Sequence, residues 1–221
     1  MRQPADGAGR DRAPLAALRG FVRQRVPLER CELCGKGLPP DHAHLVRPEN
    51  RQLVCACAPC AVLFADAGAA TYKRVPRRIT LLADYALTDE QWEALAIPID
   101  LAFFLHSSPA GQVVAVYPSP AGATESLLHL EAWDDIAAGH PRLRALEPDV
   151  EALLVNRVRH REQEGTARYF VVPIDECYRL VGLIRKSWRG LSGGAVVWRE
   201  IAEFFAQLEA RADPGPENPR A

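Results

Sequence analysis

The sequence predicts an α+β protein in which a small cysteine-rich module precedes a larger mixed domain that ends in two helices. Of the 6 cysteines, all but one lie between Cys31 and Cys60. After residue 75, short apolar runs of strand length alternate with segments of helical periodicity, and two helical segments close the pattern before residue 210. With 221 residues, 48% hydrophobic and 25% charged, the chain can bury a core and still carry a small module.

The chain divides into four predicted segments. Residues 1–14 and 210–221 combine Gly, Ala, Pro and charged residues without apolar periodicity, which predicts disorder at both ends. Residues 15–70 form the cysteine module, which an amphipathic helix from Leu15 to Val26 would open. Residues 75–209 form the larger α+β domain.

The module contains a cysteine turn, a hairpin and a helix in that order. Two residues separate Cys31 from Cys34, a spacing that lets both thiolates reach one metal ion from a tight turn. Strands at His44 to Arg47 and Gln52 to Cys55 flank a Pro-Glu-Asn turn and predict a β-hairpin. The apolar run from Cys57 to Phe64 predicts a short buried helix.

The second cysteine pair repeats the spacing of the first at the start of that helix. The positive end of a helix favours thiolate over thiol at Cys57 and Cys60. In a reducing compartment, clustered thiols at this spacing favour metal binding over disulfides. We therefore predict one structural zinc ion, with an iron-sulfur cluster as the alternative. Its predicted ligands are Cys31, Cys34, Cys57 and Cys60.

Four other cysteine and histidine residues need an assignment. Cys55 is either a small buried apolar residue, a redox or transfer thiol, or an exchangeable additional ligand. His42 and His44 precede the first strand and are either solvated loop residues or a metal ligand or general base. Cys55 and His44 are the candidates for an additional metal or redox site. Cys177 lies on an apolar helix face and is expected in the core.

The larger domain begins with strands and ends with helices. Predicted strands lie at Arg78 to Leu82, Ile99 to His106, Val113 to Tyr117 and Tyr169 to Val172. Thr88 and Gln91 have the spacing of a capping box for a helix through Leu95, and weaker helical patterns cover Leu130 to Ala138 and Asp149 to Val155. A helix capped by Asp175 runs through Trp188, and after a break from Gly190 to Gly194 the last helix carries Val197 to Leu208.

Two turn-rich segments of this domain are candidates for a partner or anion site. Pro118 to Ser126 reads as a polar loop after an apolar strand, with Ser119, Thr124, Glu125 and Ser126 as its candidate residues, or else as an ordinary surface loop. Ser192, Gly193 and Gly194 precede a helix, so their amides fit either a capping turn or an anion site. We expect the partner-binding surface within residues 75–209.

Charge and hydropathy restrict the cellular setting. The net charge of −1 gives no field that would attract nucleic acid or an anionic membrane. The sequence has neither an apolar run of membrane-spanning length nor the apolar segment of a signal peptide, so we expect no membrane insertion and a cytoplasmic location. No nucleophile, base and orienting residue can be assigned from sequence, and catalysis is unsupported.

The order of cysteine turn, hairpin and helix resembles a treble-clef zinc finger. In HNH endonucleases, which share this frame, a catalytic histidine lies near the hairpin, and His44 matches its position. The asparagine and the closing metal-binding histidine of that family have no counterparts, since Ala-Val-Leu-Phe follows Cys60. The resemblance therefore implies the fold of the module and not DNA cleavage.

The runs RCELCG, HLV, LVCACAPCAVLF, YPSPAGATES, PDVEALLVNR and ECYRLVGLIRKSWRGLSGG resemble an uncharacterised bacterial, actinobacterial-type family over residues 28 to 209. Genes of that family lie near nickel-iron hydrogenase genes, which implies a hydrogenase subunit or maturation factor as protein partner. The first hypothesis is a zinc-binding, noncatalytic accessory protein for hydrogenase assembly. The alternatives are a metal or electron-transfer protein using the cysteine cluster, and a nucleic-acid-binding treble clef using Arg47, Arg51 and Arg74 to Arg78.

Overall fold

A seven-stranded sheet forms the centre of the larger domain in the computed structural model, which describes residues 29–65, 71–126, 130–158, 167–190 and 192–214. The strand order is β10-β4-β9-β8-β5-β6-β7, and its pairs are antiparallel except for the parallel pair β10 and β4. The predicted helix from Leu15 to Val26 and the predicted disorder of residues 1–14 lie outside the described residues. The strands are β4 (Thr80–Leu81), β5 (Leu101–Ser107), β6 (Gln112–Ser119), β7 (Gly122–Ser126), β8 (Glu151–Asn156), β9 (Arg168–Pro173) and β10 (Asp213–Pro214).

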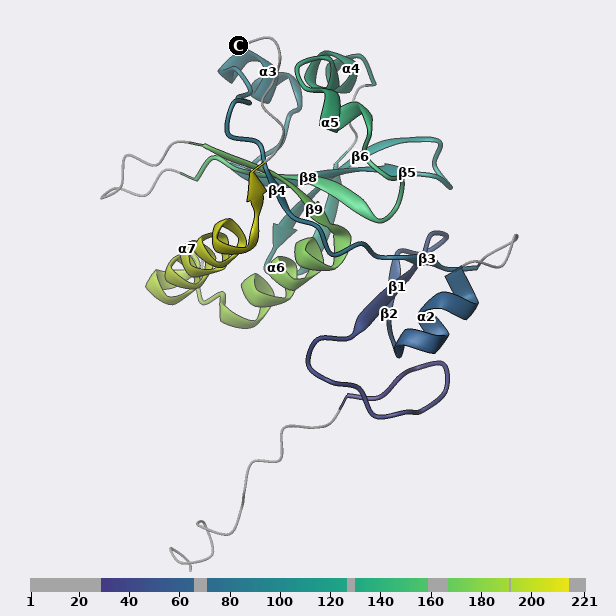
Figure 1. Cartoon of the computed structure of the whole chain (residues 1–221). Coiled ribbons are helices and arrows are strands. Elements are labelled where there is room, and N and C mark those ends of the chain that lie inside the picture. Colours follow the sequence, from purple (N-terminus) through teal and green to yellow (C-terminus); the bar gives the residue numbers. More distant parts are fainter. Residues whose placement is uncertain (1–28, 66–70, 127–129, 159–166, 191, 215–221) are drawn as a thin grey trace, which may run out of the picture.

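Helices cover both faces of this sheet (Figure 1). Because successive side chains of a strand point to opposite faces, neighbouring residues enter different cores. Phe103 packs edge-on against Tyr178 on one face, and the next residue, Phe104, stacks on Trp133 on the other. One face carries α6 (Ile174–Ser187) and α7 (Gly194–Arg211), and the other carries α3 (Asp89–Ala94), α4 (Leu130–Ala138) and α5 (Pro141–Arg144). The α+β class and the two C-terminal helices are confirmed.

The cysteine module lies beside this sheet and has its own small core. Its three-stranded sheet has the order β2-β1-β3, and α2 packs on it. Leu45 and Val54, paired across the hairpin, point into the module core together with the cysteines. The third strand extends the module's sheet beyond residue 70, where we had expected the module to end. The elements are β1 (Ala43–Arg47), β2 (Gln52–Ala56), α2 (Ala58–Ala65) and β3 (Lys73–Arg74).

The other face of the module's hairpin packs against the larger domain. Val46 is fully buried in the same apolar cluster as Phe103 and residues of α6 and α7, and Leu53 packs against that cluster. The ion pairs between the module and the sheet domain include His44 with Asp175 at 2.7 Å, Arg51 with Glu125 at 2.9 Å, and Lys73 with Asp149 at 2.7 Å. The module is thus held to α6, to β7 and to the loop before β8.

Several element predictions need correction. Most of the segment from Asp149 to Val155, which we predicted as a helix, belongs to strand β8. The strand is buried on both faces, so its apolar run lacks the alternation typical of a strand. The polar segment from Pro118 to Ser126 is a hairpin joining β6 and β7 and not a loop. Asp175 does not cap α6, since the N-cap is Pro173 and Asp175 lies in the first turn.

The predicted disordered tail also begins too early. Helix α7 continues to Arg211, and the amide of Asp213 donates to the carbonyl of Ile79 at 2.9 Å, which adds β10 to the edge of the sheet. By contrast, the capping box at Thr88 and Gln91 is confirmed by both of its hydrogen bonds, at 3.1 and 3.0 Å. Among the described residues, no helix combines the length and the apolar character needed to cross a bilayer.

Candidate metal centre

Two turns bring the four cysteines together. In the first, the amide of Gly35 donates to the carbonyl of Cys31 at 2.8 Å, and the positive φ of 75° at Gly35 closes a turn that a side chain would strain. In the second, Cys57 directly precedes α2, and its carbonyl accepts the amide of Ala61 at 2.9 Å as the helix begins. Cys60 follows one turn later on the same side. Both turns are local, so short sequence motifs determine them.

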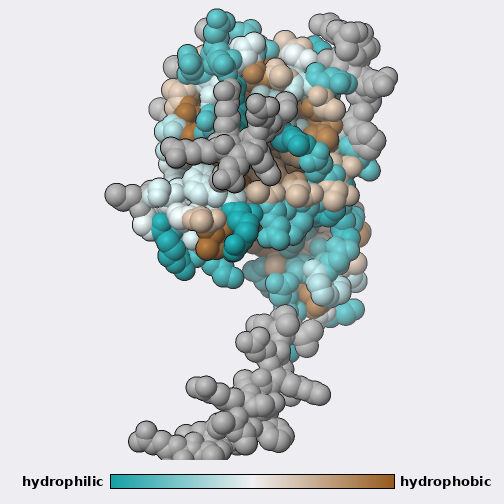
Figure 2. Space-filling view, turned by 90° about the vertical axis from the view of Figure 1, so that its left-hand side faces the viewer, coloured by the Kyte–Doolittle hydropathy of each residue, from teal (hydrophilic) through white to brown (hydrophobic). Residues whose placement is uncertain are grey.

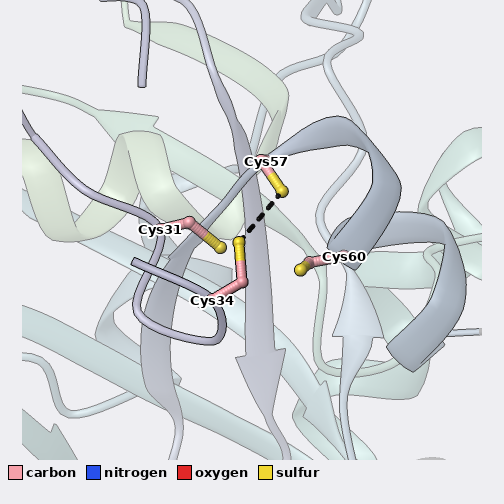
Figure 3. Close-up of side chains that lie close together, drawn as sticks. All are labelled: Cys31, Cys34, Cys57 and Cys60. Carbon is pink, nitrogen blue, oxygen red and sulfur yellow. Dashed lines mark hydrogen bonds between the residues drawn. The ribbon is translucent and has the colours of Figure 1, made fainter. Parts of the chain in front are cut away.

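The four sulfur atoms face a common centre (Figure 3). All lie within 4.8 Å of one another, and the sulfurs of Cys34 and Cys57 are 3.7 Å apart. A tetrahedral ion with metal–sulfur bonds of about 2.3 Å would hold its ligands about 3.8 Å apart. Cys31, Cys57 and Cys60 are buried in the module core, whereas Cys34 is exposed. The tetrad could therefore hold a metal ion without rearrangement of the backbone.

The electrostatics of the tetrad are uneven. Burial opposes ionisation of Cys31, but backbone amides, that of Cys57 foremost, donate to its sulfur and lower its pKa to about 6. The hydrogen bond with the thiol of Cys57, together with burial, raises the pKa of Cys60 to about 12. The site thus stabilises one thiolate, and the negative charge of that thiolate would repel a second thiolate formed beside it. A bound cation would remove that repulsion and allow all four sulfurs to act as ligands.

A family model described as a family of unknown function (DUF5947) matches residues 30–212. The chain belongs to this family. The match begins one residue before Cys31 and ends just after α7, so it covers the cysteine module and the larger domain together. No curated protein and no solved structure matches the chain.

In this DUF5947 protein, Cys55 lies outside the tetrad. It pairs with His44 across the hairpin, is half-buried and packs against the module core. His42, His44 and Cys55 form a second group whose ligand atoms lie within 4.8 Å of one another. The structure therefore brings the candidates Cys55 and His44 together and adds His42 to them. Cys177 is fully buried, and burial raises its pKa well above the usual value, as expected of a core thiol.

Asp175 contacts this second group, a role that the sequence analysis did not assign to it. Its carboxylate accepts a hydrogen bond from Nδ1 of His44 at 2.7 Å, and this bond raises the pKa of His44 although burial of the ring opposes it. The two residues are 131 positions apart. The sequence predicted that Asp175 lies at the start of a helix, but no sequence pattern predicted its contact with the hairpin.

The partner or anion candidates of the DUF5947 chain are engaged within the fold. Ser119 donates to the carbonyl of Gly122 at 3.0 Å and accepts from Thr124 at 3.2 Å, which stabilises the β6–β7 turn. Glu125 accepts from Arg51, and Ser126 pairs with Ala115 in the sheet.

The second candidate segment forms the entry to α7. Gly193 is the N-cap residue with φ of 83°, and its carbonyl accepts the amide of Arg189 at 3.0 Å. Gly194 is the first residue of the helix, and the carbonyl of Ser192 accepts from the indole of Trp198 at 3.1 Å. These contacts stabilise the turn between α6 and α7.

Proposed function

We propose that this chain is a zinc-stabilised, noncatalytic accessory protein that binds another protein. The observation that carries the proposal is the tetrad of sulfur ligands inside the core of the module. Four thiolates around zinc leave no coordination position for a substrate, and such an ion contributes folding free energy. Sulfur-only ligation at this spacing suits zinc, and the order of turn, hairpin and helix is that of a treble clef.

Three of the five arginines that would serve a nucleic-acid-binding treble clef have partners among the described residues. Arg47 donates to the hydroxyl of Tyr72 at 2.6 Å, Arg51 pairs with Glu125, and Arg77 pairs with Asp41 at 3.0 Å. Two of these contacts pair an arginine with a carboxylate, and the net charge of the chain is −1, so both the set and the whole chain attract phosphates less strongly. We therefore favour a protein partner over nucleic acid.

Exposed apolar residues on α2 offer a surface for such a partner. Val62, Leu63 and Phe64 are 52%, 69% and 39% exposed and follow one another in a single short helix. Contiguous exposed apolar residues commonly mark protein contacts. On the face of the molecule in Figure 2, hydrophilic residues predominate and hydrophobic ones are scattered between them. We place the partner contact on α2 in preference to the β6–β7 hairpin, whose Glu125 is held by Arg51.

The partner class follows from the family resemblance and not from the geometry. Genes of the family that this sequence resembles lie near nickel-iron hydrogenase genes. We therefore propose a hydrogenase subunit or a maturation factor as the partner. The zinc module would then act as a rigid support for α2, and the ion pairs to the larger domain would fix its orientation.

The test is capture of partners by the tagged full chain expressed in its native cell. Leu63→Glu should deplete hydrogenase components from the captured proteins, because a charge on the apolar surface opposes its burial. Val196→Glu is the matched control, since Val196 is also an exposed apolar helix residue, at 47%, and lies on α7. Both variants should keep the zinc content and melting temperature of the wild type. Recovery of the same proteins with Leu63→Glu would contradict the proposed surface, and absence of hydrogenase components from the wild type would contradict the proposed partner.

A further inference from the structure

A second set of metal-ligating side chains lies on the hairpin. His44 and Cys55 are direct cross-strand partners, so their side chains share a face of the hairpin, and Cys55 also contacts the edge of the module core. His42 precedes His44 by two residues, the spacing that places side chains on the same side of an extended chain. One nitrogen or sulfur atom from each of the three residues lies within 4.8 Å of the others.

Hydrogen bonds orient both histidines in the same way. Nδ1 of His44 bonds Asp175 at 2.7 Å, and Nδ1 of His42 bonds the carbonyl of Pro39 at 2.9 Å. Since a carboxylate and a carbonyl only accept, Nδ1 must donate in both rings, and the neutral imidazole then presents a lone pair at Nε2. Metal-binding histidines are held in this manner, with the distal N–H bonded to a carboxylate or a backbone carbonyl.

The free nitrogen of His42 is an independent sign of a ligand. The His42 side chain is only 5% exposed, and its Nε2 has no hydrogen-bond partner among the described residues. Buried polar atoms normally find a partner, and an unsatisfied one costs about 1–3 kcal/mol. A metal ion between His42, His44 and Cys55 would satisfy this nitrogen.

We propose that His42, His44 and Cys55 form a second metal site, distinct from the cysteine tetrad, that binds a divalent transition-metal ion of the zinc class. Two imidazoles and one thiolate suit such ions, and three protein ligands leave a fourth position open. The carboxylate of Glu32 accepts the amide of Cys55 at 2.8 Å and so holds the backbone at this ligand. The site is independent of the proposed partner binding.

The site borders a groove between the module and the larger domain. The groove has a volume of about 680 Å³, and His42, His44 and Asp175 contribute to its wall. Its arginines are paired with acidic residues of the same groove: Arg77 with Asp41, and Arg179 and Arg211 with Glu176. A ligand could therefore reach the ion from solvent without meeting a strong net charge.

A Cys-His-Asp nucleophilic triad is the rival interpretation of the same residues. It would use Cys55, His44 and Asp175 but would leave Nε2 of His42 buried and unsatisfied. A metal ion that displaces the thiol proton would bind both histidines and the cysteine, so it gives His42 a role that the triad does not.

The test is titration of the full chain, its tetrad already occupied by zinc, with Co²⁺ as the visible probe. The wild type should bind one equivalent of Co²⁺ as a second metal ion, in addition to the zinc ion. This binding should produce a thiolate-to-cobalt absorption band. Cys55→Ser should lose this band, and His42→Ala and His44→Ala should lose the second metal ion, while all three keep the first zinc ion. Asp175→Asn should weaken cobalt binding about 10- to 100-fold, because Asp175 positions a ligand without being one. Asp41→Asn, in the same groove, should leave it unchanged.

Three results would overturn this assignment. The first is a wild type that takes up no second metal ion. The second is uptake that is the same in His42→Ala and Cys55→Ser as in the wild type. The third is rapid alkylation of Cys55 that depends on His44 and not on His42 or added metal, which would assign the triad. In each case the zinc in the tetrad would remain, so the proposed structural role of the first site would stand.

Discussion

Cys55 and Cys57 are two residues apart, yet their side chains have different surroundings. Cys57 belongs to the tetrad, whereas Cys55 pairs with His44 across the hairpin. We predict that Cys57→Ser loses the tightly held zinc ion and lowers the stability of the module by several kcal/mol, because removal of a ligand forfeits binding free energy that contributes to folding. Cys55→Ser should keep this ion. Metal content and thermal unfolding of the two variants provide the measurement, and equal zinc loss in both would refute the ligand assignment.

Asp149 links the module to the larger domain through a buried carboxylate. It accepts from Lys73 at 2.7 Å, from the amide of Ser108 at 2.8 Å and from the hydroxyl of Ser108. Burial of the carboxyl opposes ionisation, but these donors outweigh it and lower the pKa of Asp149. The positive φ of 70° at this position is one that asparagine also tolerates. Asp149→Asn is therefore a substitution that removes the charge and keeps the backbone.

We predict that Asp149→Asn reduces the free energy of unfolding by about 1–3 kcal/mol at neutral pH. A lowered pKa in the folded state means that the stabilisation is complete above the unfolded value of about 3.9 and is lost as the pH falls towards the folded value. The difference between wild type and variant should therefore shrink below about pH 4. Denaturant unfolding at a series of pH values measures it, and a difference that stays constant down to pH 2 would exclude the ionised carboxylate as its origin.

At the scale of single elements, the turn into α7 has a strict steric requirement. A Cβ added at Gly193 would lie 2.8 Å from Cγ1 of Val197 and 3.1 Å from Cε3 of Trp188, and φ is 83°. We predict that Gly193→Ala lowers the free energy of unfolding by about 1–3 kcal/mol. Gly182→Ala is the control. At this exposed position in α6 the added Cβ would meet no atom within 4 Å apart from its own helix backbone and chain neighbours, and alanine should stabilise by roughly 0.5–1 kcal/mol. Chemical denaturation of both variants tests the opposite signs.

The elements that the sequence analysis predicted well are those with local signals. The capping box at Thr88 and the cysteine turn at Cys31 follow from short spacings that physical chemistry constrains directly. Strand β8 could not be recognised in this way, because helices cover both faces of the sheet and its run Glu-Ala-Leu-Leu-Val is buried throughout. The polar β7 was missed for the opposite reason, since an edge strand exposed on one side lacks a clear apolar pattern.

At the scale of the whole molecule, the two candidate metal sites differ in how far the sequence reveals them. The tetrad depends on turns within 30 residues and was predicted residue by residue as a ligand set. The second site depends on the docking of the module, because Asp175 reaches His44 only when α6 lies against the hairpin. Val46 is buried in the core shared with α6 and α7, which explains why the module docks there. A pattern-based analysis has no access to such contacts.

The shared core also predicts how the protein unfolds. Because Val46 and several ion pairs join the module to the larger domain, loss of the metal ion should destabilise more than the module. We predict that removal of the ion by a chelator lowers the melting temperature of one cooperative transition. Calorimetry before and after chelation measures this. Two separate transitions, with the upper one unchanged, would show that the larger domain is stable without the module.

The measurement that tests the central claim most directly is the metal content of the wild-type chain purified without added metal. Native mass spectrometry and elemental analysis should find one tightly held zinc ion per chain that survives a weak chelator. Alkylation should then spare Cys31, Cys34, Cys57 and Cys60 until a strong chelator removes the ion. A folded, metal-free chain whose four cysteines are all alkylated at once, or a chain that carries iron in place of zinc, would contradict the account.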